Sequence, residues 1–177
     1  MLIEVVLVTP SSQKENLKTV LADLYMASKG YTTTKRSTTR YEFVSIGPKG
    51  QIKKRIEFTQ LRRRSYYNVA FGDVMKDGRV DDIGYSNNQD IVRIISTVTD
   101  TMKDFLRDNP SAKLVFTGST QDRTEFYRRL LSRHYGTLSV GYKITALVDD
   151  GGGNVEEIEF DPNAENIYLA FLVKNKT

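Results

Sequence analysis

The chain has 177 residues, 39% of them hydrophobic, with no cysteine and a formal net charge of +4 at pH 7. This composition is typical of one folded globular unit and excludes disulfides and thiolate zinc sites, and no apolar run approaches the roughly 20 residues that a membrane-spanning helix needs. The first residues lack a basic region ahead of an apolar stretch, so we expect no secretory signal and a cytoplasmic location.

The charge is distributed unevenly along the chain. Between Lys35 and Arg64 there are ten basic and two acidic residues, a local balance of +8, which leaves −4 for the remainder. Much of that negative charge lies in Asp149, Asp150, Glu156, Glu157, Glu159, Asp161 and Glu165. This asymmetry favours a polyanionic partner or head-to-tail contacts between copies, unless neighbouring basic and acidic hairpins neutralise each other.

The first 35 residues are predicted to be a strand–helix addition. Residues 2–8 are rich in β-branched side chains, which is typical of a strand. Ser12 and Glu15 have the spacing of a capping box, which predicts a helix that ends at Gly30. Residues 31–39 are polar with little to bury, so we expect a linker.

Residues 36–177 are expected to form a single α+β domain, an antiparallel sheet with two main helices packed on one face. The expected strands are 40–46, 51–59, 65–71, a short one around Val80, 113–117, 138–148, 155–160 and 167–173. The expected helices are 88–108 and 121–134. In the second strand, alternation separates an apolar side from a charged side that contains Lys53, Arg55 and Glu57.

The turn before the second helix is a candidate anion site. It contains Gly118, Ser119 and Thr120, and Arg123 lies one turn into the helix. Free amide groups at a helix N-terminus, together with hydroxyls and an arginine, are the components of a phosphate or carboxylate site. The alternative is that Ser119 only caps the helix while Asp122 compensates its dipole.

Other polar groups lie at the junctions between one predicted element and the next. They are in Phe71-Gly72-Asp73 and in Ser86-Asn87-Asn88-Gln89-Asp90. We therefore add Asp73 and Asn87 to the candidate ligand site. Arg128 and Arg129 of the basic second helix complete it, since the planar guanidinium group suits phosphate, although a helix surface with several arginines is often only solvated.

A second candidate surface combines cations with an aromatic side chain, as single-stranded nucleic-acid sites do. Its residues are Lys53, Arg55, Arg62, Arg63, Arg64 and Tyr66. The alternative is an exposed turn with no partner.

Five aspartates could gather around Mg²⁺ or Ca²⁺ if their loop folds back: Asp73, Asp77, Asp81, Asp82 and Asp90. Their spacing matches no calcium loop, and turn and cap roles account for most of them, so we expect no metal site and no cofactor. His134 is the only histidine, and no nucleophile motif accompanies it.

Several motifs together resemble a family of uncharacterised bacterial proteins found in Bacteroidetes-type genomes and mobile elements. The motifs are F-G-D at 71–73, S-N-N-x-D at 86–90 and G-S-T-x-x-R-T-x-x-Y at 118–127. The resemblance covers about residues 41–174, and it implies a fold unit and a polar site without implying a reaction. Gln89, where the family often has glycine, and Glu125, where a basic residue is frequent, depart from it.

We expect a non-enzymatic binding protein for a phosphate-bearing ligand, either a nucleotide or a nucleic-acid backbone. Two alternatives stay open. One is a protein-interaction or inhibitor module of bacterial or phage origin, whose basic and acidic hairpins pair between chains. The other is a metal-dependent phosphodiesterase or transferase that uses Asp73, Asp82 or Asp90.

Overall fold

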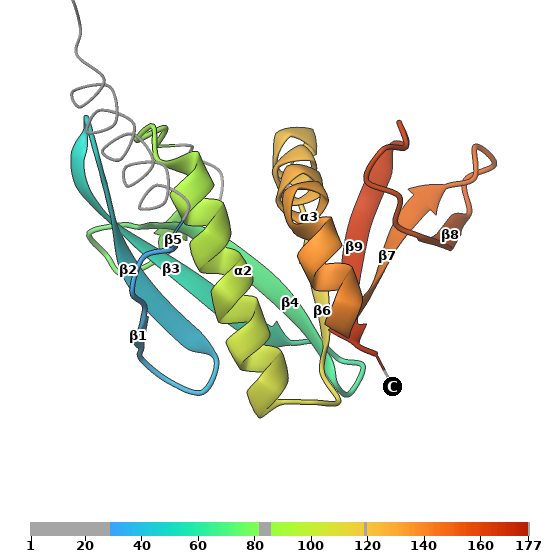
Figure 1. The fold of residues 1–177 in the computed structure, drawn as a ribbon, viewed down its shortest axis with the longest axis horizontal. Helices are drawn as coiled ribbons and strands as arrows, with labels where there is room; N and C mark the ends of the chain where they lie inside the picture. The colour runs from blue at the N-terminus through green and yellow to red at the C-terminus, as the bar shows by residue number, and fades with distance from the viewer. Residues whose placement is uncertain (1–28, 82–85, 119, 177) are drawn as a thin grey trace, which may run out of the picture.

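The computed structural model describes residues 29–81, 86–118 and 120–176. The predicted strand at 2–8 and nearly all of the predicted helix from Ser12 lie outside the described residues. Within the described residues, nine strands form one sheet and two helices accompany it, which gives an α+β fold (Figure 1).

The strands are β1 (Thr34–Lys35), β2 (Arg40–Gly47), β3 (Gly50–Gln60), β4 (Tyr66–Val74), β5 (Val80–Asp81), β6 (Lys113–Thr117), β7 (Tyr142–Asp149), β8 (Val155–Glu159) and β9 (Tyr168–Asn175). The helices are α2 (Ile91–Asp108) and α3 (Gln121–Gly141). Each expected strand from residue 40 onward has a counterpart, with ends that differ by a few residues.

The strand order is β1-β2-β3-β4-β6-β9-β7-β8, and β5 pairs with β4. The expectation of a purely antiparallel sheet is wrong, because β4 and β6 are parallel. Helix α2 lies between these strands in the sequence. It returns the chain to the end of the sheet where β4 starts, so β6 starts at the same end as β4. Strand β9 then inserts between β6 and β7 and is antiparallel to both.

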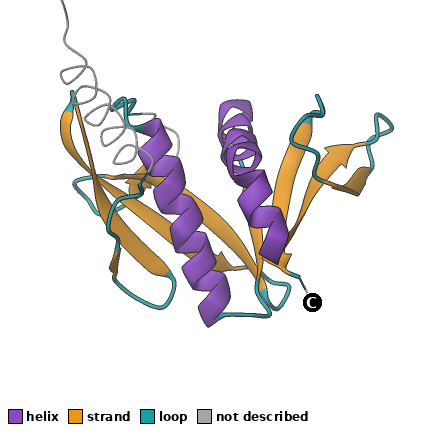
Figure 2. Ribbon diagram, viewed as in Figure 1, coloured by secondary structure: helices purple, strands orange, loops and turns teal. Residues whose placement is uncertain are grey.

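Both helices lie on one face of the sheet (Figures 1 and 2). Phe105 of α2 stacks on Phe58 of β3 with ring centroids 4.0 Å apart, and Tyr127 of α3 meets Phe116 of β6 at 5.3 Å. These rings are nearly fully buried, because the apolar stripe of each helix covers the inward residues of the strands. Among the described elements, no helix covers the opposite face.

The segment expected to be a linker is part of the fold. Thr34 and Lys35 form β1 and pair with β2, and Tyr31 is only 9% exposed, with its ring stacked on Phe43 at 5.5 Å. The polar composition of this segment concealed one aromatic side chain that reaches the core.

Helix α3 is longer than expected, since it continues through Gly136 to Gly141. Residues 138–141, expected to open a strand, therefore belong to the helix. Leu131 and Leu138 are fully buried and lie seven residues apart, which is two helical turns, so the helical period continues past the glycine.

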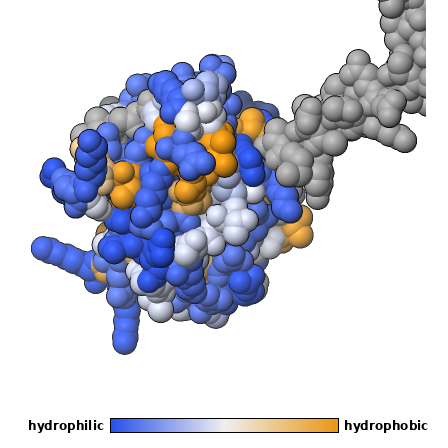
Figure 3. All heavy atoms as spheres, turned by 90° about the vertical axis from the view of Figure 1, so that its left-hand side faces the viewer, coloured by the Kyte–Doolittle hydropathy of each residue, from blue (hydrophilic) through white to orange (hydrophobic). Residues whose placement is uncertain are grey.

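The side of the molecule shown in Figure 3 is largely hydrophilic, with small separate hydrophobic groups. Hydrophobic side chains scattered in this way are normal on a folded protein. Neither helix in the described part of the chain is both long and apolar enough to cross a membrane.

Candidate functional site

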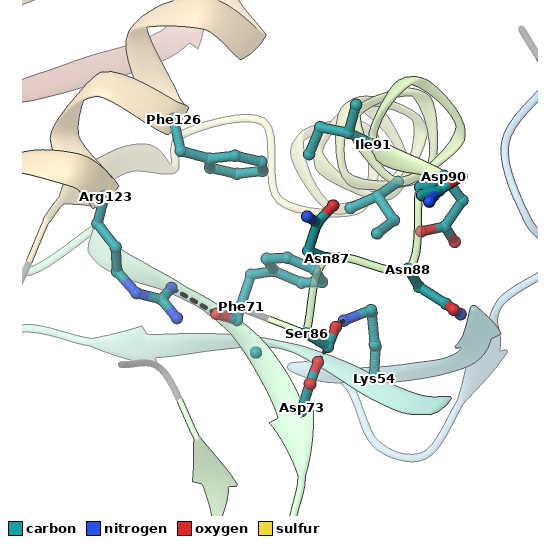
Figure 4. Close-up of a pocket in the computed structure, with 13 residues that line it drawn as sticks. Lys54, Phe71, Asp73, Ser86, Asn87, Asn88, Asp90, Ile91, Arg123 and Phe126 are labelled. Atoms are coloured by element: carbon teal, nitrogen blue, oxygen red, sulfur yellow. Dashed lines mark hydrogen bonds and ion pairs between the residues drawn. The ribbon is translucent and has the colours of Figure 1, made fainter. Parts of the chain in front are cut away.

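A cavity opens between the N-terminal ends of α2 and α3 and the strands β3 and β4 (Figure 4). The space inside it that the centre of a water molecule can reach is about 40 Å³, so a ligand larger than a few atoms would extend from the cavity into its opening. Its lining combines apolar side chains with polar and charged ones, which is typical of small-molecule sites.

Three candidate residues that are far apart in the sequence line this cavity together. They are Asp73 at the end of β4, Asn87 just before α2 and Arg123 in the first turn of α3. Ser119, which we expected beside them, lies outside the described residues.

Arg123 reaches from α3 across the cavity toward β4 (Figure 4). Its Nη1 donates to the Phe71 carbonyl oxygen at 2.7 Å. Its Nε is buried and has no hydrogen-bond partner within the described residues. A guanidinium group carries five N–H donors, so this side chain keeps donors for a bound group.

Lys54 enters the cavity from β3 and was missing from the candidate residues. Its Nζ donates to the Asp73 carboxylate and to Ser86 Oγ, the latter at 2.8 Å. The side chain of Lys54 is only 4% exposed. The sequence did contain a signal, because strand alternation places Lys54 on the inward side with Ile52 and Ile56.

The segment before α2 is held against the β2–β3 turn by Asn88. Its Nδ2 donates to Ser45 Oγ at 2.9 Å, and its Oδ1 accepts from the Lys49 amide at 2.9 Å. On either side of it, Asn87 and Gln89 have φ of 41° and 60°. Such left-handed residues often mark binding sites, and both line the cavity.

Asp90 closes the cavity on the side opposite Arg123 (Figure 4). Its Oδ2 accepts from Tyr31 Oη and from Ser45 Oγ, each at 2.7 Å, so this carboxylate is directed toward β2. Burial raises the pKa of Tyr31, and the hydrogen bond to Asp90 raises it further. The Arg93 guanidinium lies 3.9 Å from the Tyr31 ring centroid and adds a positive charge nearby.

The apolar walls of the cavity come from two aromatic rings and two isoleucines. Phe71 and Phe126 stack with centroids 5.9 Å apart. Ile91 and Ile94 of α2 complete these walls. This surface suits a flat apolar group.

In the turn that opens α3, two of the backbone amides near the predicted anion site already have partners within the turn. Thr120 is the N-cap, its Oγ1 accepts from the Arg123 amide at 3.3 Å, and its carbonyl oxygen accepts from the Thr124 amide at 3.1 Å. A Cβ added to Gly118 would lie 2.4 Å from the Thr124 nitrogen, so the turn needs glycine for close packing. The helix contributes a guanidinium group to the cavity.

Arg128 and Arg129 do not line this cavity. Both donate to Glu125, at 2.7 Å and 3.0 Å from their Nε atoms. The hydrogen bonds, with that from Arg128 the strongest, lower the pKa of Glu125 to about 2. These two arginines therefore pair within their own helix.

The candidate nucleic-acid residues separate into two groups. Lys53 and Arg55 lie on the uncovered face of the sheet and pair with Glu42 at 3.0 Å and 2.8 Å. Burial raises the pKa of Glu42, but hydrogen bonds from Arg55, Lys53 and Arg36 outweigh it and bring the pKa to about 2.

The other group lies at the far end of the β3–β4 hairpin, where Arg62, Arg63 and Arg64 are exposed in the turn and Tyr66 starts β4. This turn is separated from the cavity by the second half of β3, because Lys54 lies near the middle of that strand. The basic stretch of the sequence is thus not one continuous surface.

The aspartates considered for a metal have other contacts or lie elsewhere. Asp77 pairs with Arg79 at 2.7 Å in the exposed β4–β5 turn, and Asp82 lies outside the described residues. No group of three potential ligand side chains gathers in the part of the chain that the structure describes. His134 does not line the cavity, and burial lowers its pKa.

Comparison with known proteins places the chain in a family. Searches of curated proteins and of solved structures found no match. Residues 27–176 match a family model, and this match includes both helices and every described strand. The chain therefore belongs to DUF6934, a family of unknown function.

Proposed function

We propose that the protein binds a small phosphate-bearing molecule, such as a mononucleotide, in the cavity between α2 and α3. The observation that carries the proposal is the meeting of Asp73, Asn87 and Arg123 in one cavity, with Arg123 Nε buried and unpartnered among the described residues. A buried donor without a partner costs about 1–3 kcal/mol, so a bound anion that accepts from it would remove this cost.

The charges around the cavity favour a single anionic group at Arg123. Lys54 is matched by Asp73, and Asp90 lies on the opposite side of the cavity, where its Oδ2 accepts from Tyr31 and its Oδ1 is buried without a partner among the described residues. Arg123 donates to a neutral carbonyl oxygen and has no carboxylate within ion-pair distance among the described residues. Arginine binds phosphate through two parallel N–H···O bonds, which a remaining pair of donors can supply.

The walls favour a ligand with a flat apolar part. Phe71 and Phe126 line the cavity together with Arg123, and 7% of each residue is exposed (Figure 4). Asn87, on the other side, offers an amide donor and acceptor for polar atoms on such a ring. A nucleoside monophosphate combines these features in one molecule.

Calorimetric titration with nucleoside monophosphates and the matching nucleosides tests the proposal. We expect the monophosphate to bind about 10- to 150-fold tighter than its nucleoside, the range that a charge-assisted hydrogen bond of 1.5–3 kcal/mol provides. Arg123→Gln should abolish this difference. Arg133→Gln is the matched control, because Arg133 is exposed on the same helix and does not line the cavity.

The proposal would be contradicted if the nucleoside monophosphate and its nucleoside bound equally well. It would also be contradicted if Arg123→Gln and Arg133→Gln lost the same affinity. Arg123→Lys separates charge from geometry: it keeps the charge without the planar fork, so it should restore only part of the affinity. Thermal unfolding of each variant checks that the fold is intact.

A further inference from the structure

Three lysines that are far apart in the sequence form a row across the second half of the sheet. Lys113 of β6 is paired in register with Lys174 of β9, and Lys174 is paired with Lys143 of β7. Directly opposite residues have Cβ atoms about 4.5–5.5 Å apart, and like charges at that spacing are destabilising.

The row faces away from the helices. Leu114, Val173 and Ile144 follow or precede the three lysines in their strands and are buried in the core beneath the helices. Because successive side chains alternate across a strand, the lysines lie on the uncovered face. They are half-buried or exposed there.

An aromatic side chain extends the row onto β4. Tyr66 is paired with Lys113, whose Nζ lies 4.8 Å from the ring centroid and 3.3 Å from the Tyr66 hydroxyl. The Arg63 guanidinium lies 4.7 Å from the same ring centroid. Tyr66 is half-buried, and cations beside an aromatic ring on a sheet surface are typical of surfaces that stack nucleic-acid bases.

The described part of the structure contains no ion pair to any cation of this region. The cations are Arg62, Arg63, Arg64, Lys113, Lys143 and Lys174. Glu159 shares a surface hollow with Lys143 and Lys174 but lies beyond ion-pair distance of both. The positive charge is therefore available to an external anion, in contrast to the charge near Glu42.

We propose that this row, from Tyr66 across Lys113 and Lys174 to Lys143, binds single-stranded nucleic acid. The row crosses three strand spacings, about 15 Å, and so offers contacts to consecutive phosphates of one strand. A base stacks on the Arg63–Tyr66 pair, which gives single strands an advantage over duplexes, whose bases are already stacked. This site is separate from the cavity, which lies on the helix-covered face.

Fluorescence anisotropy with a labelled single-stranded oligonucleotide of about 16 nucleotides tests the inference. The wild-type chain should lose affinity steeply between about 50 and 200 mM salt. The double variant Lys143→Gln, Lys174→Gln should bind roughly tenfold more weakly, and the slope of log K against log salt should become less negative by about 1.4, or 0.7 per lost phosphate contact.

The matched control is Lys76→Gln with Arg79→Gln, which removes two exposed cations from the β4–β5 turn. Its affinity should stay within about twofold of wild type. Tyr66→Leu should weaken binding about 5- to 150-fold, the loss of one stacked base, while Tyr66→Phe keeps the ring and should bind like wild type.

Several results would overturn the inference. These are no binding at low salt, equal losses in the two double variants, or tighter binding of a duplex. A base-free polyphosphate that competes equally well, with Tyr66→Leu unaffected, would reduce the surface to a general polyanion site. If light scattering shows a dimer at low salt that disappears in the Lys143→Gln, Lys174→Gln variant, the row binds a second copy of the chain and not nucleic acid.

Discussion

Two basic triplets, one in the middle of strand β3 and one in the turn that follows it, make different contacts. Residues 53–55 are Lys-Lys-Arg: the two outward cations meet Glu42, and the inward one meets Asp73. Residues 62–64 are Arg-Arg-Arg, and no described carboxylate pairs with them. The first triplet thus stabilises the fold through ion pairs, whereas the second has no ion pair to a described carboxylate.

The largest difference in stability between the two triplets should appear when the inward cation, Lys54, is removed. Lys54→Ala leaves Asp73 without its partner next to the cavity, and breaking a buried pair in this way costs about 3 kcal/mol. Urea denaturation should show this loss in the free energy of unfolding. Arg62→Ala, at the exposed end, should change the same quantity by less than about 0.5 kcal/mol.

The packing at the cavity end can be tested without changing any charge. A Cβ added to Gly47 would lie 1.9 Å from the Asn88 carbonyl oxygen. Gly47→Ala should therefore displace the segment before α2 and destabilise the protein by about 2 kcal/mol, with a loss of ligand binding in the cavity.

The matched control for that change is Gly136→Ala in α3, where an added Cβ has no neighbour within 4 Å. It should stabilise the protein by about 0.5–1 kcal/mol, because alanine is the better helix former. If both glycine variants had the same effect, the close approach at Gly47 would not matter.

Acid should weaken the ion pairs that Lys53 and Arg55 form with Glu42, because Glu42 loses its charge when it is protonated. The folded pKa of Glu42 is about 2 and its ordinary value is 4.5, so its contribution is complete above about pH 4.5 and is lost as the pH falls toward 2. We expect this contribution to be about 1.5 kcal/mol, reduced by the solvent exposure of Lys53 and Arg36.

The measurement is urea denaturation at several pH values for wild type and Glu42→Gln. The difference between the two should shrink as the pH falls through this window. A difference that is independent of pH would mean that the ionised Glu42 carboxylate is not what the cations stabilise.

The smallest effect on stability should come from the arginine triplet at residues 62–64, which has no ion pair among the described residues. Changing Arg62, Arg63 and Arg64 together to Gln should leave the free energy of unfolding within about 0.5 kcal/mol of wild type, because these side chains are exposed and unpaired. Oligonucleotide binding should weaken in the same variant. A large loss of stability would mean that these arginines stabilise the fold, as residues 53–55 do.

Strand alternation accounts for what could be predicted about the sheet. It correctly separated Lys53 and Arg55 from the core side, and the same rule placed Lys54 inward, although its role there was missed. The end of α3 was predicted too early, since the helix continues through Gly136 and buries Leu138. The buried Tyr31 was missed because one aromatic residue in a polar segment gives no periodic signal.

The candidate site was predicted in part. Asp73, Asn87 and Arg123 were expected to act together, and they share one cavity, but Arg128 and Arg129 turn to Glu125 instead. The contributions of Lys54 and Phe126 depend on contacts between segments that are distant in the chain. The resemblance to a family could be recognised from short motifs, since those do not depend on contacts.

The sequence by itself determined which side chains face inward on each strand, where the two helices lie and how the basic residues cluster along the chain, because these properties depend on local period and composition. Only the tertiary structure decided which charges are neutralised and which are not. Strand order and register bring Lys113, Lys143 and Lys174 together and place Glu42 beside Lys53 and Arg55, and both result from the packing of the whole sheet.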